Sequence, residues 1–206
     1  MCNRQRYLIG VLLELFTLIG IVSSIGYVNE VARSRWVHSV MTTPGRDVMA
    51  VQTMRNFIMG ASLMASTATL LIVGTLTLSG QAENIGRSWH LLNLGGSHSA
   101  ELWIVKVLCL LVVFIVAFFA FALSVRLVNH VVFMINVPDQ DAHAALTPEN
   151  VGHRLNRAGR FFAIGMRAFF FAVPLVFWLF GANFLVIATI GLVIVLYRLD
   201  RSEYSE

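Results

Sequence analysis

Arginine, asparagine and histidine gather at the end of one long apolar run. Arg126 lies three residues before Asn129 and four before His130. On a helix these spacings place all three side chains on one face. Guanidinium groups bind phosphate and carboxylate groups, and an imidazole can also transfer a proton. The run therefore predicts a polar face suited to anions near the end of a helix.

Two other apolar runs have similar residues at their edges. Arg55 and Asn56 precede one run, and Arg157 and Arg160 precede another. Arg167 lies inside the latter run, where a charged group is costly unless it reaches the interface or faces protein. The residues that predict a site for an anion or a lipid headgroup are Arg55, Asn56, Arg126, Asn129, His130, Arg157, Arg160 and Arg167.

Two interpretations of these arginines are open. Arginine at a helix end commonly anchors the helix by reaching lipid phosphates, and asparagine bonds neighbouring helices. Alternatively, the arginines form one cytoplasm-facing site for an anionic lipid headgroup or substrate. Asp47, Asp139, Asp141 and Glu149 lie toward the far ends of the helices, so we expect no acid beside the site.

Other ionisable residues lie toward the opposite side. Glu14 and Lys106 share one half of the bilayer if the topology below holds, and they are then expected to form an intramembrane ion pair. Alternatively, each reaches water or loses its charge, and Glu14 could carry protons. His90, His98 and Glu101 match no metal-ligand spacing, and no cofactor motif is present, so we expect neither metal nor cofactor.

The elements that position these residues are long apolar helices. The 206 residues are 57% hydrophobic and 13% charged, whereas soluble domains have about 25% charged residues. The pattern predicts an all-α, polytopic transmembrane bundle that forms a single domain over residues 1–206. About five spans can be drawn, each near the ~20 residues that a spanning helix needs: 7–28, 57–79, 102–124, 161–180 and 183–199.

Basic residues predict how the chain is oriented. In the five-span arrangement eleven arginines fall on one side, and three arginines with Lys106 fall on the other. The richer side stays in the cytoplasm, so the N-terminus is expected outside and the C-terminus inside. A four-span arrangement divides the charges six against nine, which is a weaker asymmetry.

Three helices are expected to be longer than the bilayer is thick. One begins near Asp47, one runs from about Leu102 until Val137-Pro138 stops it, and one begins at Pro148 after an N-cap threonine. Their excess length should project into the cytoplasm, where most arginines lie. Gly181 with the following Ala and Asn predicts a tight hairpin between the last two spans.

Several motifs resemble one family of membrane proteins. They are Asp47 with Val51-Gln52-Thr53-Met54-Arg55-Asn56, the 65–68 stretch, Asn129-His130 to Asn136, Asn156-Arg157-Ala158, Gly165-Met166-Arg167-Ala168, and Pro174-Leu175 to Gly181. Together they resemble the bacterial and plant family called domain of unknown function 599. The resemblance covers most of residues 27–200 and implies a small multi-helix protein of the bacterial inner membrane. It implies no activity.

Three functions compete on these grounds. The chain has no Walker, dinucleotide-binding, serine-hydrolase or haem motif, which favours a structural or accessory membrane protein without catalytic residues. Such a protein is expected to contact anionic lipids and to form a homo-oligomer or a subunit of a larger complex. The alternatives are a transporter or channel, and a lipid- or quinone-handling enzyme that uses His130 as an acid or base. Arginine at a membrane boundary needs no nucleic-acid partner.

Overall fold

The computed structural model describes residues 24–80, 100–137, 143 and 146–202. Within these ranges the chain forms helices and no strand, which confirms the predicted all-α fold. The helices are α2 (Ser24–Thr42), α3 (Asp47–Gly80), α5 (Ala100–Ile135), α6 (Pro148–Phe180) and α7 (Ala182–Ser202).

Local sequence explains where the long helices begin and end. Asp47 puts a negative charge in the first turn of α3, where the helix dipole favours it. Thr147 is the N-cap of α6, with extended φ and ψ of −63° and 147°, and proline follows it. The helix α5 ends at Ile135, just before Val137-Pro138, because the residue before a proline disfavours helical angles.

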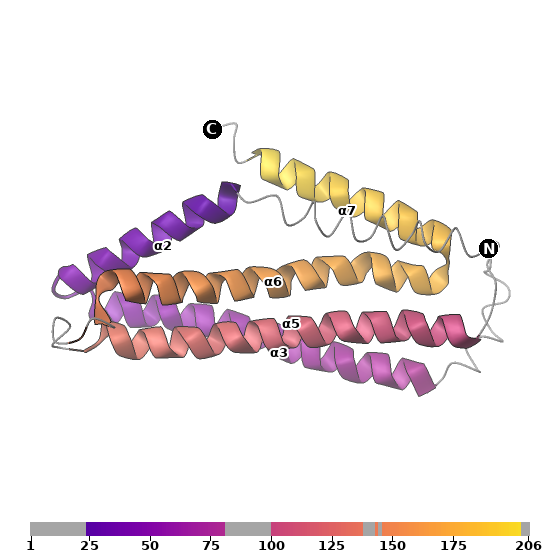
Figure 1. The fold of residues 1–206 in the computed structure, drawn as a ribbon, viewed down its shortest axis with the longest axis horizontal. Coiled ribbons are helices and arrows are strands. Elements are labelled where there is room, and N and C mark those ends of the chain that lie inside the picture. The colour runs from indigo at the N-terminus through magenta and orange to yellow at the C-terminus, as the bar shows by residue number, and fades with distance from the viewer. Residues whose placement is uncertain (1–23, 81–99, 138–142, 144–145, 203–206) are drawn as a thin grey trace.

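Gly181 separates α6 from α7, as the sequence predicts. Its φ and ψ are 158° and 162°, a combination that is essentially limited to glycine. The Leu185 amide then donates a 3.3 Å hydrogen bond to the Gly181 carbonyl, which starts α7 at once. Because the turn is so short, α7 folds back along α6 (Figure 1).

Three helices are long and apolar enough to cross a membrane. α3, α5 and α6 contain 34, 36 and 33 residues. At 1.5 Å per residue each is about 50 Å long, whereas the hydrocarbon core is ~30 Å thick. The long helices predicted from the sequence are therefore confirmed. The chain is a membrane protein by the length and composition of these helices.

The other two expected spans are less completely described. Most of the first, 7–28, lies outside the described residues, and the structure begins with α2 instead. The fifth corresponds to α7, whose apolar stretch Asn183–Val195 is shorter than the three long helices. The five-span topology therefore stays a prediction.

The helices form a long bundle (Figure 1). α5 packs against both α3 and α6, and all three run along the length of the molecule. α2 packs on α6 near the end where α3 and α6 begin, while α7 packs on α6 from the opposite end. The helix α6 therefore joins both α2 and α7 to the bundle, so a site that involves either of these helices is built against α6.

Small residues let the long helices approach closely. In α3, Ala68 is fully buried and packs with Ala117 and Phe121 of α5. In α6, Gly165 faces the same Phe121, and a Cβ at this glycine would lie only 2.6 Å from Cε1 of the ring. Phe121 is fully buried and also contacts the ring of Phe169 at 5.3 Å. The three helices are therefore closely packed at mid-length.

Candidate functional site

Contacts between the long helices set the relative heights of the predicted site residues. The rings of Phe57 in α3 and Phe162 in α6 lie 5.3 Å apart, measured between centroids. The Ser124 hydroxyl of α5 donates a 2.8 Å hydrogen bond to the Ala158 carbonyl of α6. Several arginines lie within a few residues of these two contacts and therefore at nearly the same height. We call them the arginine belt: Arg55, Arg126, Arg157 and Arg160.

The predicted site residues lie on the outside of the bundle. Arg55, Asn56, Arg126, Asn129, His130, Arg157, Arg160 and Arg167 are all exposed. The guanidinium of Arg157 lies over the Phe161 ring, 5.8 Å from its centroid. Within the described residues no hydrogen bond joins any two of the eight. The structure thus places seven of them toward the end of the bundle that carries α2, and Arg167 nearer to mid-length, without gathering the eight in a pocket. Ligand binding stays a prediction.

Arg167 lies deeper along the bundle than the belt. It is seven residues beyond Arg160, which is about 10 Å at helical rise. Its neighbour Ala168 packs in the mid-length cluster with Ala68 and Phe121. The Arg167 side chain is exposed, so in a bilayer its guanidinium can extend along the helix toward the headgroup interface.

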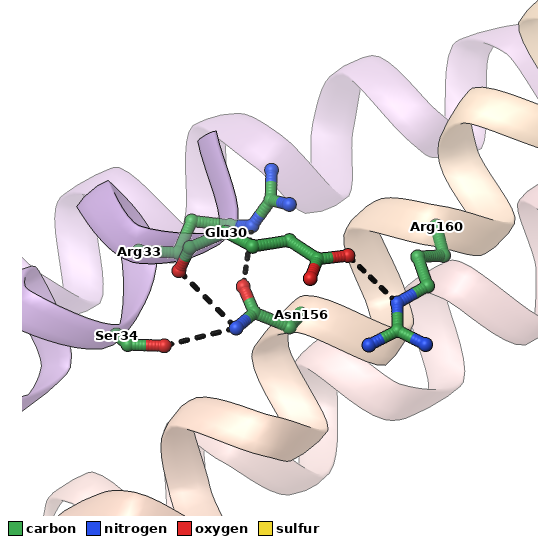
Figure 2. A network of polar contacts seen from close by, with 5 residues as sticks. All are labelled: Glu30, Arg33, Ser34, Asn156 and Arg160. Carbon is green, nitrogen blue, oxygen red and sulfur yellow. Dashed lines mark hydrogen bonds and ion pairs between the residues drawn. The ribbon is translucent and has the colours of Figure 1, made fainter. Parts of the chain in front are cut away.

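The expectation that no acid lies beside the arginines is wrong. Glu30 of α2 accepts a 2.8 Å hydrogen bond and ion pair from Nε of Arg160 (Figure 2). Glu30 lies 130 residues before Arg160 in the chain, so local sequence gives no sign of the pair. The packing of α2 against α6 brings the two together.

A buried asparagine organises the polar contacts around this ion pair. Asn156 of α6 is only 5% exposed. Its side-chain oxygen accepts a 2.9 Å hydrogen bond from Nε of Arg33, and its Nδ2 donates to Oγ of Ser34 at 2.9 Å and to the Glu30 carbonyl at 3.2 Å (Figure 2). Both amide hydrogens and the oxygen are used, as a buried amide requires. We call these five residues the α2–α6 junction: Glu30, Arg33, Ser34, Asn156 and Arg160.

Glycines of α6 let α2 come close at this junction. A Cβ at Gly152 would lie 3.5 Å from Cα of Ser34, which is ordinary contact. A Cβ at Gly159 would lie 2.8 Å from Cζ of Arg33, so only glycine allows the guanidinium to rest on the helix there. The pKa of Arg33 lies below its usual value, mainly because burial disfavours the charged guanidinium. The Glu30 carboxylate opposes this effect, and the Arg160 guanidinium adds to it.

The junction residues of α2 went unrecognised in the sequence, although a signal was present. Glu30, Arg33 and Ser34 are spaced at i, i+3 and i+4, which places them on one helix face. Asn156 and Arg160 are four apart on α6 and present a matching face. Complementary polar faces on two helices are a pairing signal, but the sequence alone does not say which helices meet.

Only Lys106 of the predicted Glu14–Lys106 ion pair lies within the described residues. Glu14 lies outside the described residues. Lys106 of α5 is half-buried, and its Nζ lies 5.7 Å from the centroid of the Trp178 ring of α6. Such a cation–π contact offers the ammonium group a partner within the bundle. His90 and His98 also lie outside the described residues.

The comparisons with known proteins concern the whole chain. No curated protein and no solved structure matches it at a significant level. The family described as "Protein of unknown function, DUF599" matches residues 9–204, which is nearly the full length. This match confirms the resemblance seen in the motifs, and the chain belongs to the DUF599 family.

Proposed function

We propose that this protein is an accessory component of the bacterial inner membrane, and that its arginine belt binds anionic lipid headgroups of the cytoplasmic leaflet. In this proposal the end of the bundle that carries α2 faces the cytoplasm. The bundle itself provides the anchor, and the belt selects the lipids that surround it.

The observation that carries the proposal is the common height of exposed arginines from three different helices. Arg55, Arg126 and Arg157 lie close to Phe57, Ser124 and Phe161, where the apolar parts of their helices begin. Headgroup phosphates lie at this boundary of a bilayer. A guanidinium offers planar N–H donors that fit a phosphate better than a lysine ammonium does.

The charge of the belt supports the same proposal. Within the described residues Arg160 with Glu30 is the one ion pair, so no described acid neutralises the other belt arginines. Exposed basic groups near an anionic membrane surface contribute about 1 kcal/mol each to membrane attraction. The three other belt arginines, Arg55, Arg126 and Arg157, place positive charge on three different helices at one height.

The test is lipid retention by the full-length protein. The protein is reconstituted in nanodiscs of mixed phosphatidylglycerol and phosphatidylcholine. Native mass spectrometry then counts the lipids that stay bound when the protein is released from the nanodisc. Arg126→Gln should lower the ratio of retained phosphatidylglycerol to phosphatidylcholine. Arg46→Gln, which removes an equal charge at an exposed position bonded to Ser39, should not. An unchanged ratio in Arg126→Gln and in the other belt variants contradicts the proposal.

A further inference from the structure

The α2–α6 junction leaves two guanidiniums with unused donors. Arg33 binds Asn156 through Nε, and Arg160 binds Glu30 through Nε. Within the described residues neither arginine makes a hydrogen bond through its terminal Nη groups. Figure 2 shows that the guanidinium of Arg33 points away from Asn156, so its outer edge is directed out of the junction.

Arg33 is held more firmly than an ordinary surface arginine. Its Nε is fixed by a buried asparagine, and its Cζ rests against α6 at Gly159. A donor that is already fixed loses less conformational entropy when a ligand binds, and it therefore binds more tightly. Arg160 is different, because its side chain is 64% exposed and free to adjust to a ligand.

The charges at the junction do not balance. Arg33 and Arg160 supply two positive charges, and Glu30 supplies one negative charge. The two guanidiniums are close enough for Arg160 to act electrostatically on Arg33. An additional anion would relieve their repulsion. The Nη groups of Arg160 are directed away from Arg33 (Figure 2), so Arg160 must turn about its exposed side chain to share a tetrahedral oxyanion with Arg33.

We infer that the α2–α6 junction binds a phosphate group, with the Nη edge of Arg33 as its fixed contact and Arg160 as its mobile second contact. The inference deepens the proposed function, because it rests on lipid binding at this end of the bundle and assigns one specific site. The phosphate group is either part of a lipid headgroup or a free phosphate ion. The same N–H donors would bind both.

The test compares variants that change the site with variants that match them elsewhere. Arg33→Gln removes the fixed contact, and Gly159→Ala displaces the guanidinium without changing any charge. The matched controls are Arg35→Gln, which removes one exposed charge from the same helix, and Gly74→Ala, where a Cβ meets nothing within 4 Å. Arg33→Lys keeps the charge but loses the planar fork.

Two probes distinguish the sources of the phosphate, both with the full-length protein. Retention of phosphatidylglycerol in nanodiscs tests the lipid headgroup. Inorganic phosphate, added to the protein in phosphatidylcholine nanodiscs, tests the free anion through the shift in melting temperature. Arg33→Gln and Gly159→Ala should each weaken binding of one of these probes roughly ten-fold, as expected for a lost hydrogen bond to a charged group. Arg33→Lys should fall between them and the wild type.

The outcomes separate this inference from the proposed function. If Arg126→Gln lowers lipid retention while Arg33→Gln and Gly159→Ala match their controls with both probes, the belt stands and the junction site is wrong. If no arginine variant alters either probe, both are wrong. If only inorganic phosphate responds to the junction variants, the site is supported and its ligand is the free anion. Hydrogen exchange measured in α2 checks whether each variant keeps α2 packed on α6. If Gly159→Ala loosens α2, Arg33→Lys is used in its place to test the site.

Discussion

Asn156 makes three of the four side-chain hydrogen bonds between α6 and α2 in the described part of the chain. Its amide meets a donor on one side and two acceptors on the other, so the orientation of the amide is determined by its partners. The exposed ion pair beside it contributes less, because a solvated salt bridge is worth about 0–1 kcal/mol. At the residue scale, a neutral buried amide therefore matters more to this packing than the charges around it.

Replacing Asn156 with alanine should loosen α2 selectively. The change leaves Arg33 Nε without its acceptor and removes the Asn156 contacts to Ser34 and the Glu30 carbonyl, which costs about 1–3 kcal/mol. Hydrogen exchange followed by mass spectrometry should show faster exchange in α2 and little change in α5. Asn129→Ala, at an exposed position, is the control. Equal exchange in the two variants would show that Asn156 does not hold α2.

The residue scale is also where prediction from sequence succeeded only in part. The heights of Arg55, Arg126 and Arg157 followed from their places in the apolar runs, because helical rise fixes height. Their partners did not follow. Glu30 meets Arg160 only because two helices far apart in the chain pack together, and helical periodicity carries no information about such a pairing.

At the scale of elements, the tightest contact joins α5 to α6. Gly165 leaves room for the Phe121 ring, which is enclosed by its neighbours and cannot move out of the way. The bounds of α3 and α6 were predictable, since Asp47 and Pro148 are local signals that favour a helix start. The packing of α2 on α6 was not, because it depends on contacts made by the folded bundle.

Gly165→Ala should destabilise the bundle. The added Cβ overlaps an immobile ring, and overpacking of this kind costs about 1–3 kcal/mol. The free energy of unfolding, measured by denaturant titration in mixed micelles, should fall accordingly. Gly60→Ala is the matched control, because a Cβ there meets nothing within 4 Å and alanine favours a helix. A loss of stability in Gly60→Ala equal to that in Gly165→Ala would contradict this account.

At the scale of the whole molecule, most arginines of the described residues lie toward one end of the bundle. The belt and the α2–α6 junction lie at the end where α3 and α6 begin, and Gly181 lies at the other. The helix α7 has 21 residues and returns from Gly181 along α6. At 1.5 Å per residue it spans about 30 Å, the thickness of a hydrocarbon core. The sequence places Arg198 and Arg201 near the C-terminal end of α7.

A reporter at the C-terminus should therefore be active in the cytoplasm. Green fluorescent protein fused after residue 206 should fluoresce, because that protein matures in the cytoplasm and not after export. Alkaline phosphatase at the same position should be inactive, since it needs the oxidising side of the membrane. The reverse pattern would overturn the predicted orientation and move the arginine belt to the outer leaflet.

The belt has a mechanical consequence for how the protein stands in a bilayer. Its guanidiniums are attached to three separate helices and face outward. A tilt that moves one of these helices deeper pushes its guanidinium toward the acyl chains, and a tilt that raises a helix lifts its guanidinium away from the phosphates; both displacements are unfavourable. Spinning about the membrane normal leaves every guanidinium at its own depth. The protein is thus free to turn in the membrane plane while it is kept upright.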